Sequence, residues 1–291
     1  MPELPEVETT VSYLQKNIIG LTIQNVWFDY QKTIKNLEKE EITKILKNKT
    51  VQNIERRGKN ILIYLTDNYL LLIHQKLTGH LLYGQWKYQN NKWIPLENIQ
   101  SLSEPVNKFI HFLIEFDNHK MLALSDMRRF AKVVIGKTEK VLALKELKEL
   151  GPDPLDPSTD WQTFKNLILS QKRKIKQVLM DQTVISGIGN IYSDEILWAS
   201  QIHPAKPANK LTEPEIKNIY RNARNILQMA IKEKGTSFSD YRVPNGQKGN
   251  FGQFLKVYGR QNQKCPRCQH LIQTLKIGSR TAHYCPNCQK L

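Results

Sequence analysis

The chain begins Met1-Pro2-Glu3-Leu4-Pro5-Glu6, and this hexapeptide decides how the rest of the sequence is interpreted. Removal of Met1, which the small Pro2 permits, would leave a secondary amine beside the carboxylate of Glu3. A neutral amine of this kind attacks an aldehyde-like carbon and forms an iminium ion. The positive end of a following helix favours the neutral form, and a free α-amino group has a pKa of roughly 7.7–8.0. The simpler alternative is that Pro2 and Pro5 only start a helix whose dipole the acids complement.

Apolar residues recur after Pro5 at spacings of four, three and four, at Val7, Val11, Leu14 and Ile18. This is the stripe of an amphipathic helix, and Gly20 is a suitable stop. The terminal amine is therefore expected on a rigid, packed element.

Short β-type runs follow from Leu21 to about Val134, and they suggest a β-sandwich or barrel. The runs are Leu21–Phe28, Val51–Arg56, Asn60–Leu65, Leu70–Gln75, Phe109–Phe116, Met121–Leu124 and Lys132–Ile135. Asp117–Lys120 is expected to be a hairpin turn. The stretch Gln85–Ser103 is polar and Asn-rich apart from Trp86 and Trp93, so we expect a loop or insertion there.

Three prolines at nearly alternate positions in Leu150–Pro157 exclude a regular helix or central strand and predict a domain boundary. The pattern beyond it is helical, at Trp161–Ser170, Ile175–Asp181, Ile191–Ser200 and Pro214–Lys234. Within this half, Ile185–Tyr192 is a glycine-rich turn that opens a helix. It suits either a phosphate at a helix N-terminus or a tight helix–helix connection with Asn190 as its cap.

The composition predicts a polyanionic partner. The 291 residues include 43 Lys+Arg and 27 Asp+Glu, which gives a net charge of +16. Between Tyr241 and Leu291 there is no acid at all. Charge alone fits DNA, RNA or an anionic membrane, but no apolar run approaches the ~20 residues of a membrane span. The start is acidic and lacks the apolar core of a signal peptide, so we expect a soluble cytoplasmic protein.

All four cysteines lie in this basic tail, as the pairs Cys265/Cys268 and Cys285/Cys288. Two C-x₂-C knuckles at this separation give the four thiolates that zinc prefers. Two disulfides are the alternative, but a reducing compartment favours metal. Four sulfur ligands leave no open position, so one structural Zn²⁺ is expected.

Several motifs together resemble the bacterial formamidopyrimidine-DNA glycosylase family, and they occur in the family's order. They are MPELPEVET at Met1–Thr9, Arg56-Arg57-Gly58-Lys59, Asp126-Met127-Arg128-Arg129-Phe130, Gly187–Tyr192, Lys256-Val-Tyr-Gly259 and the terminal cysteines. The resemblance implies an α+β fold: an N-terminal helix plus β-sandwich, then a helical helix-two-turns-helix domain with a C-terminal four-cysteine zinc finger. It divides the chain into a catalytic domain (1–135), a hinge (136–158), the helix-two-turns-helix domain (159–240) and a lesion-loop and zinc-finger module (241–291).

The resemblance also implies a bifunctional glycosylase and AP lyase of base excision repair. Its substrate would be double-stranded DNA containing oxidised purines such as 8-oxoguanine and formamidopyrimidines. Pro2 would attack C1′ to form a Schiff base, Glu3 would move protons at the sugar, and Glu6 would be a supporting carboxylate. Lys59 would contact the phosphate beside the lesion and assist β-elimination, and Arg280 would act in δ-elimination. We expect a monomer that acts in the bacterial cytoplasm on the nucleoid.

The remaining site residues carried over by the resemblance contact DNA. Arg128 and Phe130 would fill the gap left by the flipped nucleotide, with Leu77 at a third wedge position where the family usually has Met. The phosphate contacts would come from His74, Lys172, Lys176, Asn190 and Arg280. Phe109 stands where some members have a polar DNA contact, so that contact is expected to be missing. Gly235–Gly252 would include a mobile loop over the flipped base.

Two other functions compete with this one. An endonuclease VIII-like glycosylase for oxidised pyrimidines shares the Pro-Glu terminus and the zinc finger, although Leu4–Thr9 and the Arg128/Phe130 pair favour the purine enzyme. A non-catalytic zinc-finger protein that binds or senses damaged DNA would fit the charge and the cysteines, but it leaves the Pro-Glu terminus unexplained.

Overall fold

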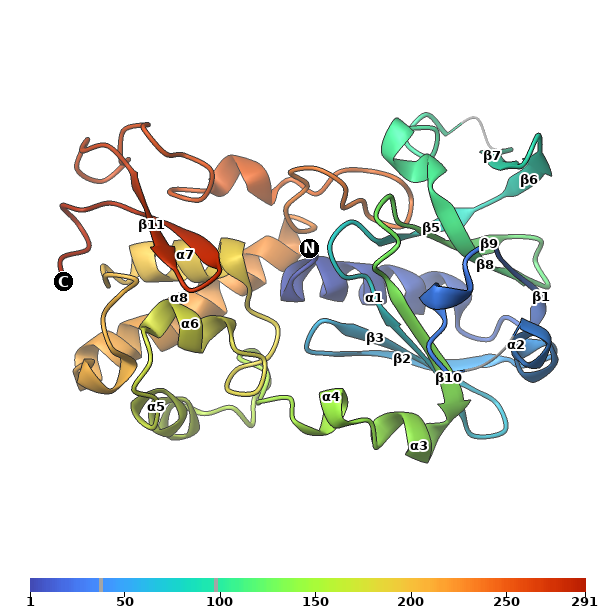
Figure 1. The fold of residues 1–291 in the computed structure, drawn as a ribbon, viewed down its shortest axis with the longest axis horizontal. Helices are drawn as coiled ribbons and strands as arrows, with labels where there is room; N and C mark the ends of the chain where they lie inside the picture. The colour runs from blue at the N-terminus through green and yellow to red at the C-terminus, as the bar shows by residue number, and fades with distance from the viewer. Residues whose placement is uncertain (37–38, 97–98) are drawn as a thin grey trace. The chain divides into compact units, whose positions relative to one another are not determined.

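The computed structural model describes residues 1–36, 39–96 and 99–291, and they form two compact units (Figure 1). The first unit comprises Met1–Lys148 and Glu233–Gly252, and the second comprises Glu149–Lys232 and Gln253–Leu291. Residues 233–252 therefore pack with the N-terminal part of the chain. The sequence-based division had assigned them partly to the helical domain and partly to the zinc-finger module.

The N-terminal helix α1 (Leu4–Ile18) is present as predicted. Val7, Val11, Leu14 and Ile18 are all buried, because their spacing places them on one face of the helix. Each such side chain contributes about 1.5–3 kcal/mol through its burial. After the helix, Gly20 takes a φ of +84°, a value that glycine adopts without strain.

Two four-stranded antiparallel sheets form the body of the first unit, with strand orders β1-β8-β9-β5 and β10-β4-β3-β2. The strands are β1 (Ile23–Phe28), β2 (Val51–Arg57), β3 (Asn60–Leu65), β4 (Tyr69–His74), β5 (His80–Gly84), β8 (Ile110–Phe116), β9 (Met121–Ser125) and β10 (Lys132–Lys137). Alternate residues enter one shared core with α1 and the helix α2 (Lys39–Leu46), for example Ile61, Ile63 and Leu65 of β3. The predicted α+β class and β-sandwich are confirmed.

A separate hairpin occupies part of the stretch that the sequence predicts to be a loop or insertion. Strands β6 (Trp86–Gln89) and β7 (Lys92–Pro95) pair antiparallel. Their turn consists of Asn90 and Asn91 at φ values of +52° and +58°. Asparagine tolerates this conformation, and such a turn matches the twist of paired strands, so the Asn-rich sequence makes a hairpin. Residues 97 and 98 of the same stretch lie outside the described residues.

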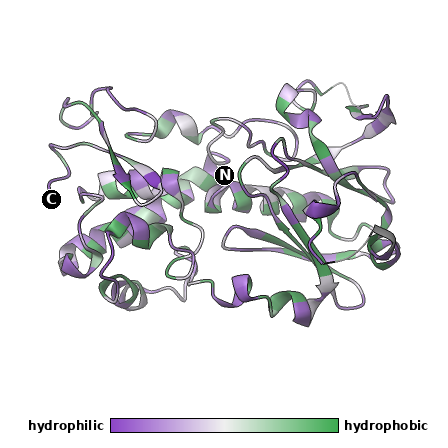
Figure 2. Cartoon of the chain, in the orientation of Figure 1, coloured by the Kyte–Doolittle hydropathy of each residue, from purple (hydrophilic) through white to green (hydrophobic). Residues whose placement is uncertain are grey.

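Helices dominate the second unit, as expected. They are α5 (Trp161–Leu169), α6 (Ile175–Met180), α7 (Asn190–Ala199) and α8 (Glu213–Lys232), followed by the hairpin of β11 (Gln273–Ile277) and β12 (Arg280–Tyr284). Asp160 caps α5 by accepting the backbone N–H of Thr163 at 2.8 Å. Figure 2 shows both hydrophilic (purple) and hydrophobic (green) residues along these helices, as expected for amphipathic helices.

The first unit ends with two short helices, α3 (Thr138–Leu142) and α4 (Lys145–Lys148), before the proline-rich stretch. Among the described residues, the structure contains no helix whose length and apolar character would allow it to span a membrane.

Candidate active site and nucleic-acid interface

The N-terminal residues are enclosed in the first unit. Pro2 is buried and Glu3 is only 2% exposed, whereas Met1 is 45% exposed. Burial lowers the pKa of the terminal ammonium below its ordinary value of 8.0, while Glu3 and Glu6 raise it and Lys59 lowers it. The surroundings therefore enlarge the neutral, nucleophilic fraction of an amine at this end of the chain.

Glu6 anchors residues 233–252 to α1. Its Oε2 accepts the backbone N–H of Glu3 at 2.8 Å, and its Oε1 accepts the backbone N–H of Thr236 at 2.7 Å. The hydroxyl of Tyr241 donates to the Glu6 carbonyl at 3.1 Å. Gly235 has a φ of +77°, and a Cβ there would lie 2.7 Å from Glu6 Oε1. Glu6 thus acts as an acceptor that fixes the loop, a role that the sequence does not reveal.

Lys59 lies in the turn between β2 and β3, and its side chain is 5% exposed. The turn is held against α1 by Arg56, whose Nε donates to Glu8 Oε2 at 2.6 Å. Arg56 also donates to the Gly58 carbonyl at 3.2 Å. The Arg-Arg-Gly-Lys motif therefore fixes the lysine near the chain terminus, in agreement with its effect on the pKa of the terminal ammonium.

His74 ends strand β4 and is neutral over the physiological range. Burial, followed by the charges of Lys76, Lys59 and Lys132, lowers its pKa from 6.5 to about 3. Its Nδ1 accepts the backbone N–H of Lys76 at 3.0 Å, so the ring proton belongs on Nε2. Any phosphate contact by His74 would use this N–H as a neutral donor.

Arg128 and Phe130 extend from the first unit as an exposed pair. The Arg128 guanidinium lies 4.8 Å from the centre of the Phe130 ring, and Phe130 is 50% exposed. Met127 of the same loop is 51% exposed, so two large apolar side chains and a guanidinium are available for contact with a partner. Leu77, in the turn after β4, is half-buried.

A buried carboxylate, Asp126, joins the two loops that carry these residues. Its Oδ1 accepts the hydroxyl of Thr78 and the backbone N–H of Arg128, the latter at 3.3 Å. Its Oδ2 accepts the backbone N–H of Ala131 at 2.7 Å. No role was assigned to Asp126 or Thr78 from the sequence, although Asp126 is the first residue of the Asp126–Phe130 motif. The available signal was an acid directly before a Met-Arg-Arg-Phe run, at the end of an apolar strand.

In the second unit, Lys176 corrects one sequence-based expectation. Its side chain is fully buried and forms an ion pair with Asp194 Oδ1 at 2.5 Å. Its Nζ also lies 3.1 Å from Ser193 Oγ and 3.4 Å from the Asn190 carbonyl oxygen. An enclosed ammonium cannot reach a phosphate, so Lys176 is not a direct DNA contact. Lys172 is exposed and remains a candidate.

Asp194 and Glu195 on α7 hold the C-terminal tail in the second unit. Asp194 Oδ2 accepts the backbone N–H and the Nδ1–H of His283, at 2.9 and 3.0 Å. The carboxylate of Glu195 accepts three consecutive backbone N–H groups at 2.9 Å each, from residues 256, 257 and 258. The backbone of the Lys-Val-Tyr-Gly motif thus binds the Glu195 carboxylate.

Asn190 and Arg280 are connected through this network. Asn190 is the first residue of α7, and its Oδ1 is buried with no hydrogen-bond partner among the described residues. Arg280 is exposed at the start of β12, directly after a tight turn in which Gly278 has a φ of +59°. Because His283 of the same strand is bound to Asp194 of α7, the two predicted phosphate contacts share one rigid support.

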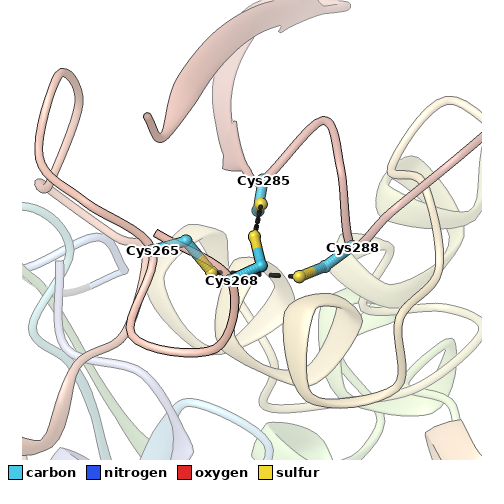
Figure 3. Close-up of side chains that lie close together, drawn as sticks. All are labelled: Cys265, Cys268, Cys285 and Cys288. Carbon is cyan, nitrogen blue, oxygen red and sulfur yellow. Dashed lines mark hydrogen bonds between the residues drawn. The ribbon is translucent and has the colours of Figure 1, made fainter. Parts of the chain in front are cut away.

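The four cysteines converge at the end of the second unit (Figure 3). All are free, and their sulfur atoms lie within 4.8 Å of one another. The Sγ atoms of Cys265 and Cys288 are 3.9 Å apart, and those of Cys268 and Cys285 are 3.3 Å apart. Tetrahedral zinc with bonds of about 2.3 Å needs sulfurs about 3.8 Å apart, so the set fits one structural ion.

Comparisons with known proteins agree with this arrangement along the whole chain. Family models match residues 1–133 (formamidopyrimidine-DNA glycosylase N-terminal domain), 150–242 (formamidopyrimidine-DNA glycosylase H2TH domain) and 262–291 (zinc finger found in FPG and IleRS). The formamidopyrimidine-DNA glycosylase of Pelotomaculum thermopropionicum is 37% identical, over 95% of each chain.

Solved structures of the Lactococcus lactis Fpg are similar as well. Its complex with DNA containing Fapy-dG has a TM-score of 0.85 and 33% identity, and covers 99% of this chain and all of that one. The same values hold for its complex with DNA containing an abasic site. The expected helix-two-turns-helix domain and four-cysteine zinc finger are thereby confirmed.

Proposed function

Because the chain belongs to the formamidopyrimidine-DNA glycosylase family, we propose that it excises oxidised purines from duplex DNA and then cleaves the strand. 8-Oxoguanine and formamidopyrimidines are the proposed lesions. The observation that carries this proposal is the enclosed N-terminus: a buried Pro2 next to a buried Glu3, with Lys59 close enough to influence the terminal ammonium.

In the proposed reaction, Met1 is removed and the Pro2 nitrogen attacks C1′ of the damaged nucleotide. The bond between C1′ and the base breaks, the base leaves with the bonding electrons and takes up the proton that the Pro2 nitrogen loses, and the sugar ring then opens to leave an iminium ion. Glu3 supplies the proton that the ring oxygen takes up. Loss of a C2′ proton then expels the 3′ phosphate, with Lys59 beside the phosphate, and Arg280 assists loss of the 5′ phosphate. Burial lowers the pKa of the Met1 ammonium in the unprocessed chain, and the same enclosed surroundings would favour the neutral amine of Pro2 that the first step needs.

DNA binding is proposed to involve both units. Arg128, Phe130 and Leu77 would fill the gap in the duplex, which offsets the cost of a few kcal/mol for unstacking the lesion. His74, Lys172 and Asn190 would contact phosphates, Asn190 through the first turn of α7. The structural zinc ion would hold the hairpin that presents Arg280. We further propose that the protein acts as a monomer on chromosomal DNA in the bacterial cytoplasm, with residues 1–135 as its catalytic domain.

Borohydride trapping on a duplex with 8-oxoguanine opposite cytosine tests the substrate and the nucleophile together. The processed wild-type protein should give a covalent adduct, Pro2→Gly should give none, and Glu3→Gln should bind DNA without base excision. Pro5→Ala is the matched control, because Pro5 lies in the helix and should leave trapping intact. An adduct that persists in Pro2→Gly would refute the proposed nucleophile.

The same assay separates the competing functions. A clear preference for thymine glycol over 8-oxoguanine would favour an endonuclease VIII-like enzyme. Tight binding to damaged DNA with no adduct from any lesion would favour a non-catalytic damage sensor.

A further inference from the structure

The β6–β7 hairpin forms one side of a cavity of about 450 Å³ in the first unit. Trp86 and Leu102 are nearly fully buried in its lining, and Trp93 and Phe109 are half-buried there. The proposed glycosylase reaction uses none of these side chains. The volume and the aromatic lining are those of a small-molecule or nucleotide site.

The charged groups of the cavity favour an anion. Lys92 and Lys108 line it and are exposed. Glu104 also lines it, but its Oε2 is paired with the guanidinium of Arg242 at 2.7 and 2.8 Å. Because Arg242 neutralises this acid, the two lysines give the cavity a net positive potential.

An unused hydrogen-bond donor lies in the same wall. The indole N–H of Trp93 is buried and has no acceptor among the described residues. The ring packs edge-on against Trp27 and in a tilted arrangement against Tyr88, with ring centroids 5.3 and 5.1 Å away. Buried donors are nearly always paired, so a ligand that supplies an acceptor would complete the site.

The cavity adjoins the loop that carries the proposed wedge. The backbone carbonyl of Phe109 accepts the N–H of Asp126 at 2.8 Å, and Asp126 organises the loop of Arg128 and Phe130. Ser125 Oγ, one residue earlier, donates to the Val106 carbonyl at 3.0 Å. A ligand in the cavity would thus lie beside the surface proposed to enter DNA.

We propose that this cavity binds an unpaired nucleotide of the DNA that the enzyme holds. The base packs against the aromatic side chains, its polar edge accepts the Trp93 N–H, and its phosphate lies near Lys92 and Lys108. Aromatic faces combined with lysines are the general means of binding single-stranded nucleic acid, because every base has a stacking face. The inference rests on the proposed DNA-binding function and extends it to frayed or gapped DNA near a lesion.

The test compares affinities for a blunt duplex and for the same duplex with a short single-stranded extension. Both carry a tetrahydrofuran abasic analogue, which has no base to excise. The extension should improve the Kd about tenfold, the typical effect of one stacked base. The double variant Lys92→Ala/Lys108→Ala and Trp93→Phe, which keeps an aromatic side chain but removes the indole N–H, should each lose this gain. Lys87→Ala should keep it, because Lys87 is an exposed lysine of the same hairpin outside the cavity.

A second measurement identifies the occupant directly. 5-Iodouracil in the extension should photocrosslink to a peptide that contains Trp93 or Phe109. Equal affinity for blunt and extended DNA, or crosslinks only elsewhere, would overturn the proposal. Competition by free thymidine monophosphate at concentrations near that of the DNA would assign the cavity to a free nucleotide instead. Borohydride trapping on blunt 8-oxoguanine duplex is scored separately, so a failed glycosylase assignment is distinguishable from a failed cavity assignment.

Discussion

Replacing Thr78 with valine should uncouple the two loops that carry the proposed wedge residues. Thr78 is buried, and its hydroxyl donates to Asp126 Oδ1 and accepts the backbone N–H of Arg128 at 3.1 Å. Valine has a similar shape without the hydroxyl. Asp126 would keep the N–H groups of Arg128 and Ala131, so its own loop stays organised. Two hydrogen bonds are lost, and the one to the Asp126 carboxylate alone is worth about 1.5–3 kcal/mol.

The functional consequence follows from where this energy acts. If about 2 kcal/mol serves to place Leu77 relative to Arg128, wedge insertion should become less favourable by about 30-fold. The phosphate contacts are untouched, so affinity for undamaged DNA should stay the same. The variant should therefore lose discrimination between damaged and undamaged duplexes and retain general binding.

2-Aminopurine next to the lesion measures insertion, because its fluorescence rises when its neighbour is unstacked, and urea unfolding measures stability. Thr22→Val is the matched control, since it breaks a hydroxyl pair with Thr50 at 3.0 Å in the same unit, away from the wedge loops. The control should lower stability with a normal fluorescence change. A full fluorescence change in Thr78→Val, despite the expected loss of stability, would refute the coupling.

Three further predictions concern other parts of the site. Lys176→Met should lower the free energy of unfolding by about 3–5 kcal/mol, because it leaves the buried Asp194 without its cation. The matched variant Lys172→Met should leave urea unfolding unchanged and reduce the salt dependence of DNA binding. The pKa of His74 is about 3 in the folded chain and 6.5 in the unfolded chain. Below pH 6.5 the unfolded chain therefore binds a proton that the folded chain does not, and the free energy of unfolding decreases as the pH is lowered. At pH 5 this amounts to roughly 2 kcal/mol, which His74→Gln should remove from urea unfolding curves. Cys268→Ser or chelation should reduce zinc below one per chain and increase hydrogen exchange throughout β11 and β12.

Local patterns in the sequence predict the elements that have a simple period. The four-residue and three-residue spacing of α1, the alternation of the sandwich strands and the paired cysteines each follow from geometry that neighbouring residues determine. Lys172 and Lys176 show the limit of prediction from local sequence patterns. They belong to one basic run, yet Lys176 is buried because it lies on α6 opposite Asp194, eighteen residues later. Only tertiary packing distinguishes the two lysines.

The acid-free tail takes its anionic hydrogen-bond acceptors from earlier parts of the chain. From Tyr241 onward the chain has no Asp or Glu, so any anionic acceptor for its buried donors must come from elsewhere in the sequence. Glu104 pairs with Arg242, Glu195 binds the N–H groups of residues 256–258, and Asp194 binds His283. Asp194 and Glu195 are buried and Glu104 is paired, so these acids add little negative charge to the surface, whereas tail residues such as Lys264, Arg267 and Arg280 stay exposed. The same pairing that orders the tail therefore leaves a cationic surface for DNA, and the charge asymmetry of the sequence serves folding and binding together.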